Sequence, residues 1–339
     1  MKKILSKDCF KLLKTSLLVL VLLFAISGNA LAESGSSGEE FKPGEMIDHH
    51  IKDAHSWEIA HGLVVHLPVI LYNHGSLDIF SSANFYDEQH NLVPYKGYAM
   101  DHEHISATDG SHPIDFSITK NVLFIFIDAA LMLLLFFAVA RGYKKNAGKA
   151  PSGIQSFFEP IIIFVRDEIV KPNLGEKKYE RYLPYMLTLF FFIWFGNLLG
   201  LLPGAANMTG NIAITMVLAV GTFLLTNLSG NKHYWGHIFN TPGVPLALKP
   251  IIVPVEIIGM FTKPISLMVR LFVAITAGHI VILSLMSLTF IFHSFAVGIG
   301  STVVVTVITF IEILVATIQA YVFTMFSSMY IGMAVDDHH

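Results

Sequence analysis

Long apolar runs separated by short polar segments fill the chain from about residue 118 onward. A helix needs ~20 apolar residues, with a range of ~17 to ~25, to cross the hydrocarbon core of a bilayer. Runs of this length suggest five spanning helices. These runs are Val122 to Ala140, about 183 to 202, about 211 to 228, about 254 to 291 and about 295 to 334. Leu201-Leu202-Pro203-Gly204 breaks the second run from the third, and Phe292-His293-Ser294 marks a turn between the last two.

The last two runs form a predicted hairpin whose arms are unusually long. A helix rises ~1.5 Å per residue, so an arm of ~38 residues extends ~57 Å, well beyond a ~30 Å hydrocarbon core. We therefore expect these arms to tilt strongly, to bend, or to lie partly in the interface. Pro254 and Pro264 are positions where a kink is expected.

Basic residues indicate which side of the membrane each loop occupies. Arg141, Lys144, Lys145 and Lys149 follow the first run, which places that end in the cytoplasm by the positive-inside rule. Counting crossings from there puts the loop at 231 to 250 and the tail at 336 to 339 on the same side. Residues 150 to 180 alternate apolar with charged positions, a pattern that favours an amphipathic helix lying along the interface.

The amino-terminal end differs from the rest. Residues 1 to 32 read as a secretory signal peptide, with five lysines before the apolar run Leu17 to Ile26 and a predicted cleavage after Ala32. The alternative, an uncleaved first spanning helix, has too few apolar residues. Residues 33 to 117 are then a periplasmic extension, in which ten of the sixteen histidines lie. Alternation in the stretch 61 to 67 predicts a few strands there.

Composition supports the same division. The chain is 53% hydrophobic and 14% charged, whereas soluble proteins carry about 25% charged residues. We predict an all-α membrane protein built from residues 118 to 335, with the extension before it. The one cysteine, Cys9, lies in the predicted signal, so disulfides and cysteine metal sites are not expected in the mature chain. No cofactor is expected either.

Histidines in the extension leave one metal hypothesis open. Imidazole is a common ligand of transition metals, and such a site could form from His49 and His50 with His55, or from His102 with His104. The alternative is that these side chains are simply solvated among acidic residues.

Arg270 is the most informative residue of the membrane region. From Leu271 through Val335 the one residue with a full charge is Glu312. A guanidinium does not lose its proton, and placing it near the bilayer centre costs ~2.5 to ~17 kcal/mol depending on the reference state. Glu256, Lys263 and Arg270 are seven residues apart, so one helix face carries them all. A charged side chain retained at this cost is expected to have a functional role.

Neighbouring residues suggest which function. Val273, Ala274, Ala277 and Val281 continue the arginine's face and are small or slim, which lets another helix approach the guanidinium. His279 lies half a turn away and is expected to face a different surface.

Glu312 and Gln319 share a face of the second arm. The hairpin can therefore place titratable groups on both sides of one arginine and separate two aqueous paths. Alternatives remain open: Arg270 could anchor the helix by snorkelling, Glu312 could pair structurally with His279, and Glu256 and Lys263 could form a solvated rim.

The run Pro264-Ile265-Ser266-Leu267-Met268-Val269-Arg270-Leu271-Phe272, continuing to Ala277-Gly278-His279, resembles the signature of subunit a of the F-type ATP synthase. Further matches come in the family's order. They are Asn197 with Leu201-Leu202-Pro203, Glu256 and Gln319-Ala320-Tyr321-Val322-Phe323. The resemblance covers about 120 to 334. Val273-Ala274 depart from it, because the family commonly has a small residue and then Asn there.

That resemblance implies a proton-translocating stator. Arg270 would be the essential arginine that faces the rotating c-subunit ring and keeps two half-channels apart. Glu256, His279, Glu312 and Gln319 match positions that line the half-channels or flank the arginine, with Lys263, Ser266 and Asn197 in support. The implied partners are the c ring, the b-subunit peripheral stalk, the rest of the complex and lipids of a bacterial inner membrane, and no nucleic acid. Other members of the family have an acid at the position of His279 and a histidine at the position of Glu312. This exchange of both residues suggests that the two side chains interact.

Two other functions compete with this one. In a proton-coupled secondary transporter, Arg270 would bind an anionic substrate, but the chain lacks the paired, broken helices in corresponding halves that such folds favour. A metal permease would depend on the histidines of the extension. Bond-making chemistry is not expected of the chain itself.

Overall fold

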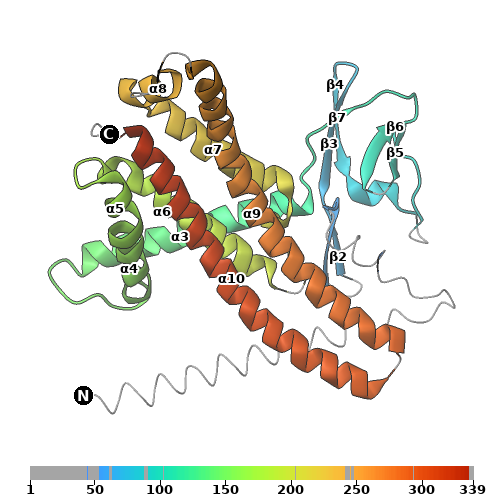
Figure 1. Ribbon diagram of the computed structural model, residues 1–339. Helices are drawn as coiled ribbons and strands as arrows, with labels where there is room; N and C mark the ends of the chain where they lie inside the picture. Colours follow the sequence, from blue (N-terminus) through green and yellow to red (C-terminus); the bar gives the residue numbers. More distant parts are fainter. Residues whose placement is uncertain are drawn as a thin grey trace, which may run out of the picture.

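The computed structural model (Figure 1) describes residues 44, 53–60, 63–87, 91–101, 103–202, 204–240, 245, 248–292 and 294–335. Strands come first and helices follow from residue 120. The amino-terminal elements are β1 (Ser56–Ala60), β2 (Leu63–His66), β3 (Pro68–Asn73), β4 (Ser76–Ser81), the 3-10 helix η1 (Ser82–Phe85), β5 (Tyr98–Asp101), β6 (His104–Ala107) and β7 (Ile114–Asp115). The later elements are α3 (Lys120–Lys145), α4 (Ile154–Phe164), the π-helix η2 (Val165–Val170), α5 (Lys171–Leu174), α6 (Tyr179–Gly200), the 3-10 helix η3 (Met208–Gly210), α7 (Ile212–Leu228), α8 (Lys232–Phe239), α9 (Lys249–Phe292) and α10 (Phe295–Val335).

The extension contains three small antiparallel sheets, with orders β1-β2, β4-β3-β7 and β5-β6. The β3–β4 hairpin turns at His74 and Gly75, which both have positive φ, as a two-residue hairpin loop requires. Along β3, Val69 and Leu71 point inward and are fully buried. A separate apolar core forms around them, and it consists of Val69, Leu71, Phe80, Phe85, Tyr98, Met100 and Ala107. The predicted strands are thus confirmed.

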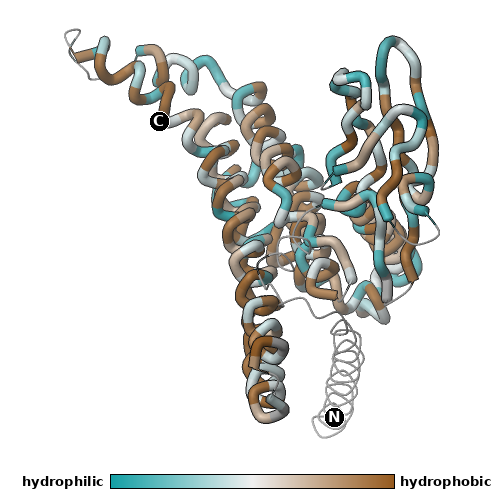
Figure 2. The backbone as a smooth tube through the Cα atoms, turned by 90° about the vertical axis from the view of Figure 1, so that its right-hand side faces the viewer, coloured by the Kyte–Doolittle hydropathy of each residue, from teal (hydrophilic) through white to brown (hydrophobic). Residues whose placement is uncertain are grey.

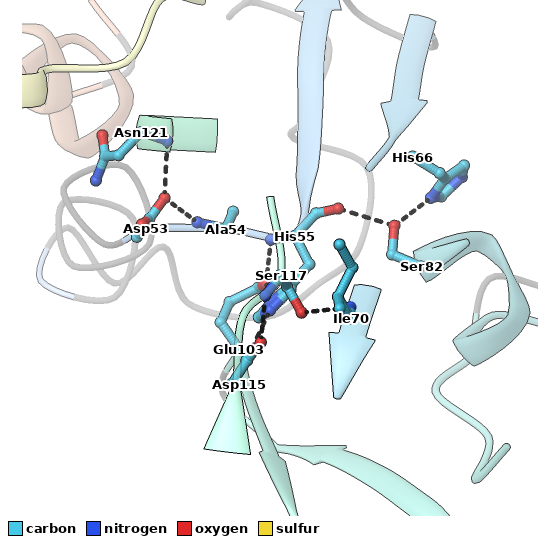
Figure 3. A network of polar contacts seen from close by, with 10 residues as sticks. All are labelled: Asp53, Ala54, His55, His66, Ile70, Ser82, Glu103, Asp115, Ser117 and Asn121. Atoms are coloured by element: carbon cyan, nitrogen blue, oxygen red, sulfur yellow. Dashed lines mark hydrogen bonds and ion pairs between the residues drawn. The ribbon is translucent and has the colours of Figure 1, made fainter. Parts of the chain in front are cut away.

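His55 lies at the base of the extension between two carboxylates (Figure 3). Its Nδ1 lies 3.3 Å from Glu103 Oε2 and its Nε2 lies 3.4 Å from Asp115 Oδ2, and the side chain is almost fully buried. Burial by itself would lower the pKa of His55, but the carboxylates of Asp115 and Glu103 outweigh it and raise the pKa to about 9. His55 is therefore a cation at neutral pH, held by two anions.

Polar contacts join the extension to the first long helix and to a loop. Asp53 Oδ1 accepts a hydrogen bond of 3.0 Å from the backbone N–H of Asn121, which is one of the unpaired donors of the first turn of α3 (Figure 3). Trp57 Nε1 donates to the carbonyl oxygen of Gly204 at 2.8 Å, in the loop after α6. The strands therefore rest directly on the helical part of the chain.

The helical part has the predicted membrane architecture. Four described helices, α3, α6, α9 and α10, are long and apolar enough to cross a membrane. The predicted third span, α7, has 17 residues, the lower limit for crossing, and is bent by 102° from α8 at a short break. The first helix does not end at Ala140 as its apolar run does, but continues to Lys145. The fold is a mostly helical membrane protein, as predicted.

Helices α9 and α10 form the long hairpin, with 44 and 41 residues. They lie side by side and run obliquely across α3 (Figure 1), and Figure 2 shows that the end nearest their turn is mostly hydrophobic, with some paler segments. Exposed Leu288, Ile299 and Val303 belong to this end. Side chains of this kind, open to the surroundings on both arms, are suited to lipid or to another apolar surface.

The segment α4–η2–α5 packs against the carboxyl-terminal half of α10. Ser328 Oγ donates to the carbonyl oxygen of Ile169 at 3.0 Å. Gly332 lies directly against the backbone of Asn173, where a Cβ would overlap the carbonyl oxygen. Buried Val165, Ile169 and Leu174 join the main helical core here. The charged positions between them are half-buried or exposed, in keeping with an amphipathic segment.

Some predicted features lie outside the described residues. They are the signal peptide 1 to 32 with Cys9, residues His49, His50 and His102, the centre of the hairpin turn at His293, and the tail 336 to 339.

Candidate functional site

Arg270 lies on the edge of the buried stripe of α9. Leu267, Leu271 and Ile275 recur along one face of the helix and are buried, whereas Ser266 and Val273 are exposed. At 100° per residue, Arg270 borders the stripe on the side of these exposed residues, and His279 borders it on the opposite side. The predicted half-turn between the two therefore holds, yet both can reach elements packed on the stripe.

The guanidinium of Arg270 is held by an aromatic ring. Its Cζ lies 4.3 Å from the ring centroid of Phe326 on α10, a cation–π distance. Its Nη1 is buried and has no hydrogen-bond partner. Among the described residues, no carboxylate lies within ion-pair distance of it. The site therefore holds a permanent positive charge that the described chain does not neutralise.

Glu312 and His279 meet in a small cavity on one side of Arg270. The cavity volume is about 10 Å³, close to what one water molecule needs. It is lined by Asn197, Leu201, Ala274, Ile275, His279, Glu312, Val315 and Ala316. Glu312 is 8% exposed, and neither of its carboxylate oxygens has a hydrogen-bond partner. The two titratable side chains therefore share a cavity without a direct hydrogen bond between them.

Glycine and alanine make the space that this cavity needs. A Cβ on Gly278 would overlap the Oε1 atom of Glu312, so the missing side chain lets the carboxylate lie against α9. Ala274, where the sequence departs from the family pattern, lines the same cavity. A small apolar side chain there adds room and removes an amide that could hold a water.

Asn197 closes the cavity from the side of α6. Its side chain is buried, its Nδ2 donates to the carbonyl oxygen of Ala316 at 3.4 Å, and its Oδ1 accepts from Thr209 Oγ1 at 2.6 Å. These bonds connect α6, η3 and α10 at one point. Trp194, which lies one turn before Asn197 on α6, donates from its Nε1 to Thr317 Oγ1 at 3.0 Å. The wall of the cavity on this side is therefore held in place by hydrogen bonds.

A second cavity, of about 20 Å³, lies on the other side of Arg270. It is lined by Ala219, Thr222, Phe223, Thr226, Asn227, Tyr234, Met260, Lys263, Pro264, Leu267 and Tyr330. Lys263 Nζ lies 5.4 Å from the ring centroid of Tyr330. Along α9, this cavity takes residues up to Leu267 and the first takes residues from Ala274 onward, so Arg270 lies between them.

The other predicted residues fall around this arrangement. Gln319 is half-buried and lies seven residues after Glu312 and seven before Phe326, so it shares their face of α10 and lies between the cavity and the arginine's ring contact. Glu256 is half-buried one heptad before Lys263, and Ser266 is exposed. Neither is among the residues that line the two cavities described above.

Sequence reasoning missed Asp128. It lies inside the first apolar run, on α3, and is fully buried with no hydrogen-bond partner for either carboxylate oxygen. The signal was available, since an acid within a membrane helix is a functional hypothesis by default. In the extension, no group of three His, Cys, Asp or Glu residues that could hold a metal occurs among the residues the structure describes.

Comparison with known proteins identifies relatives over most of the chain. The family profile described as "ATP synthase A chain" matches residues 122–332, and one described as "Domain of unknown function (DUF8433)" matches residues 46–122. A Chlorobaculum tepidum protein named "ATP synthase subunit a 2" is 38% identical over 317 residues, which is 91% of this chain and 78% of that protein. An "ATP synthase subunit a" from Chloroherpeton thalassium is 44% identical over 232 residues, covering 66% of this chain and 69% of the relative. Another, from Anaeromyxobacter sp., is 37% identical over 319 residues, covering 91% and 74%.

Proposed function

The chain belongs to the family of ATP synthase A chains, and from that premise we propose that it is a proton-translocating stator subunit of the F-type ATP synthase in which Arg270 separates two half-channels. The cavity of Glu312 and His279 is the inner end of the periplasmic half-channel. The cavity of Lys263 and Tyr330 belongs to the cytoplasmic one. The chain performs no bond-making chemistry.

One observation carries this proposal, namely that the two cavities lie on opposite sides of Arg270 along α9. A proton that reached one cavity could cross directly to the other only by passing a fixed positive charge. Coulomb repulsion in a medium of low dielectric opposes that crossing. A proton therefore has to leave the chain and travel on a moving partner.

The partner we propose is a ring of c subunits. Arg270 borders the exposed face of α9 with Ser266, Val273 and Ala277, whose small or slim side chains permit a close approach. Since no described carboxylate of the chain pairs with the guanidinium, it remains able to attract a carboxylate on the ring that has just lost its proton. Gln319, on the same face as Phe326, supports this contact region.

Energetics favour a rotary device. One proton moving across 100 mV releases only ~2.3 kcal/mol, so several transfers have to be added mechanically before a bond can be made. Histidine and glutamate suit such transfers because their surroundings can bring their proton affinities near the working pH. Glu256, at the cytoplasmic end of the charged face, is proposed to line the outer part of the second path.

The same proposal sets the partners and the location. The chain is a multi-pass protein of the bacterial inner membrane, and its partners are the c ring, the b-subunit peripheral stalk, the remaining subunits and lipids. Residues 33 to 117 lie in the periplasm after removal of the signal 1 to 32, and residues 336 to 339 lie in the cytoplasm.

The test is proton pumping by inverted membrane vesicles that carry Arg270→Ala. We expect ATP-driven pumping and ATP synthesis to fall to background because the ring is no longer guided past the boundary, with a passive leak if the two paths join. Arg181→Ala is the matched control, since Arg181 also lies over an aromatic ring, that of Tyr182, but is exposed. Equal pumping by the two variants, at equal incorporation into the complex, would overturn the proposal.

A further inference from the structure

Asp128 is a buried acid to which the proposed path assigns no task. It lies two turns into α3, its side chain is 0% exposed, and neither oxygen has a hydrogen-bond partner. An unpaired carboxylate in such surroundings is expensive whether or not it is charged, since even the neutral form leaves its polar atoms unsatisfied. Packing alone gives no reason to keep it, because an apolar residue would fill the same space at lower free energy.

The surroundings of Asp128 connect it to the wall of the Glu312 cavity. Its Oδ2 lies 3.9 Å from the point where a Cβ on Gly196 would be, and the methyl group of Met208 contacts that same point. The next residue of α6 is Asn197, and the next residue of η3 is Thr209. Those two are hydrogen-bonded to each other, and Asn197 lines the cavity. Asp128 and the cavity therefore lie on two sides of the same α6–η3 junction.

We propose that Asp128 is a further proton-binding site, which exchanges its proton with the cavity of Glu312 and His279 across the junction made by Asn197 and Thr209. The inference rests on the proposed function and adds to the periplasmic half-channel a second proton-binding site, nearer the periplasm than Glu312. In each transfer the proton leaves the carboxyl oxygen of Asp128 and is accepted by the carboxylate of Glu312. Asp128 is then an anion until a proton from the periplasmic side neutralises it.

The side chains at the junction suit this transfer without carrying the proton themselves. Thr209 can donate and accept, and its 2.6 Å bond fixes the amide of Asn197. A polar pair held in this way can orient a water between the two carboxyl groups. Gly196, which has no side chain, leaves room for the methyl group of Met208 next to Asp128.

An apolar cluster that includes Phe124 and Met208 lies beside Asp128, and Trp57 of the extension packs against this cluster. Phe124 lies one helical turn before Asp128 and is buried, and its ring meets that of Trp57 edge-on with centroids 5.2 Å apart. Trp57 in turn bonds to Gly204. This aromatic cover limits direct contact between Asp128 and the aqueous phase, as a relay site requires if protons are to arrive one at a time.

The experiment measures passive proton flux through the complete membrane complex, with the soluble part removed, for Asp128→Asn and Asp128→Glu. Asp128→Asn keeps the size and polarity of the side chain but cannot bind a proton, and we expect the flux per assembled complex to fall at least tenfold. Asp128→Glu should keep at least half of the parent flux. Thr324→Val serves as the control, because Thr324 is buried and bonded within its own helix but lines neither cavity.

A second measurement covers the case in which the Asn variant does not assemble. The chain has a single cysteine, Cys9, so Asp128→Cys in a Cys9→Ser background offers one thiol. We expect Ag⁺ added from the periplasmic side to block the residual flux of this variant and to leave the Cys9→Ser parent unaffected. No Ag⁺ effect would overturn the inference, because the position would not be on an ion-accessible path.

Glu312→Gln is measured in parallel so that two failures can be told apart. If Asp128→Asn keeps the parent flux while Glu312→Gln loses it, the further inference is wrong and the proposed function stands. If neither substitution lowers the flux, the proposed function itself fails. A loss of flux in Asp128→Asn that Asp128→Glu does not restore would show a packing role and would also overturn the relay.

Discussion

The extension and the membrane helices treat buried charge in opposite ways. In the extension, the almost fully buried His55 lies between the partly exposed carboxylates of Glu103 and Asp115. In the membrane helices, the buried carboxylate oxygens of Asp128 and Glu312 and Nη1 of Arg270 have no hydrogen-bond partner. The first region uses ionisable groups to hold its fold together, whereas the second buries ionisable atoms to which its fold gives no hydrogen-bond partner.

We propose that this difference separates structural from functional groups. Removing one member of a buried, paired set leaves a charge uncompensated and destabilises the fold. Removing an unpaired buried group relieves a cost instead, so its presence needs another reason. We therefore expect substitutions in the extension to lower stability and to spare proton flux, and substitutions among the unpaired membrane groups to do the reverse.

Glu312→Gln should give the largest effect on function. The amide keeps the shape of the side chain but cannot take up a proton, so proton flux should fall by ~10-fold or more. Thermal unfolding of the assembled complex should occur at the same temperature or higher, because no ion pair or hydrogen bond is lost. A variant that lost stability as well as flux would place Glu312 with the structural charges.

His55→Gln should give the largest effect on the stability of the extension. The pKa of His55 is about 9 in the folded chain and 6.5 as its ordinary value, so its charged contacts contribute roughly 3 kcal/mol at neutral pH. Because the folded pKa is the higher one, this contribution is complete below pH 6.5 and is lost as the pH rises through 9. Protease sensitivity of the extension in membranes, measured from pH 6 to 10, should rise steeply in the parent and stay uniformly high in the variant.

The matched control for His55 is another His–Asp contact. His74 lies 3.1 Å from Asp109, but both side chains are exposed. The pKa of Asp109 is lowered to about 2, mainly by hydrogen bonds from Ser111 and to a smaller extent by His74. Solvent screens such a pair, so His74→Ala should leave the protease profile unchanged. A change as large as that of His55→Gln would mean that burial does not distinguish the two contacts.

Two glycine substitutions should give smaller effects, one mainly on stability and the other mainly on proton flux. Gly332→Ala places a Cβ on the backbone carbonyl of Asn173, which cannot move easily, so we expect a loss of about 1 to 3 kcal/mol in stability with normal flux per complex. Gly278→Ala meets only the end of the Glu312 side chain, so flux should fall several-fold with less loss of stability. Gly259→Ala, with open space around it, should change neither.

Much of the fold was predictable because the membrane constrains it. Apolar runs of sufficient length have to become helices, since every backbone group must be hydrogen-bonded within the segment, and the structure confirms helices at all five runs. The strands followed from alternation in the extension. Length alone was less informative for α7, because its 17 residues are at the lower limit for crossing. The apolar pattern ends at Ala140, so it did not show that α3 continues through basic residues to Lys145.

The candidate site was predictable in its members but not in its arrangement. Arg270, Glu312 and His279 stand out because charge and imidazole are rare in apolar sequence. Asp128 is also an isolated charge in apolar sequence, but the length of the run around it already explained that segment as a spanning helix. Helical periodicity placed residues on faces of single helices. It could not say that α6 contributes Asn197 to the Glu312 cavity, since Asn197 and Ala316 are 119 residues apart in the chain.

By itself, the sequence determined that this chain spans a membrane, that its extension is a separate β-rich segment, and that Arg270 and Glu312 are the two fully charged residues between 270 and 335. The reason is local, because helix formation and burial in lipid depend on the composition and spacing of each segment. Only the tertiary structure decided that His55 is clamped by two acids, that Arg270 lies between two cavities, and that Asp128 adjoins the wall of one of them. These relations depend on contacts between segments distant in sequence, which no periodicity within one segment encodes.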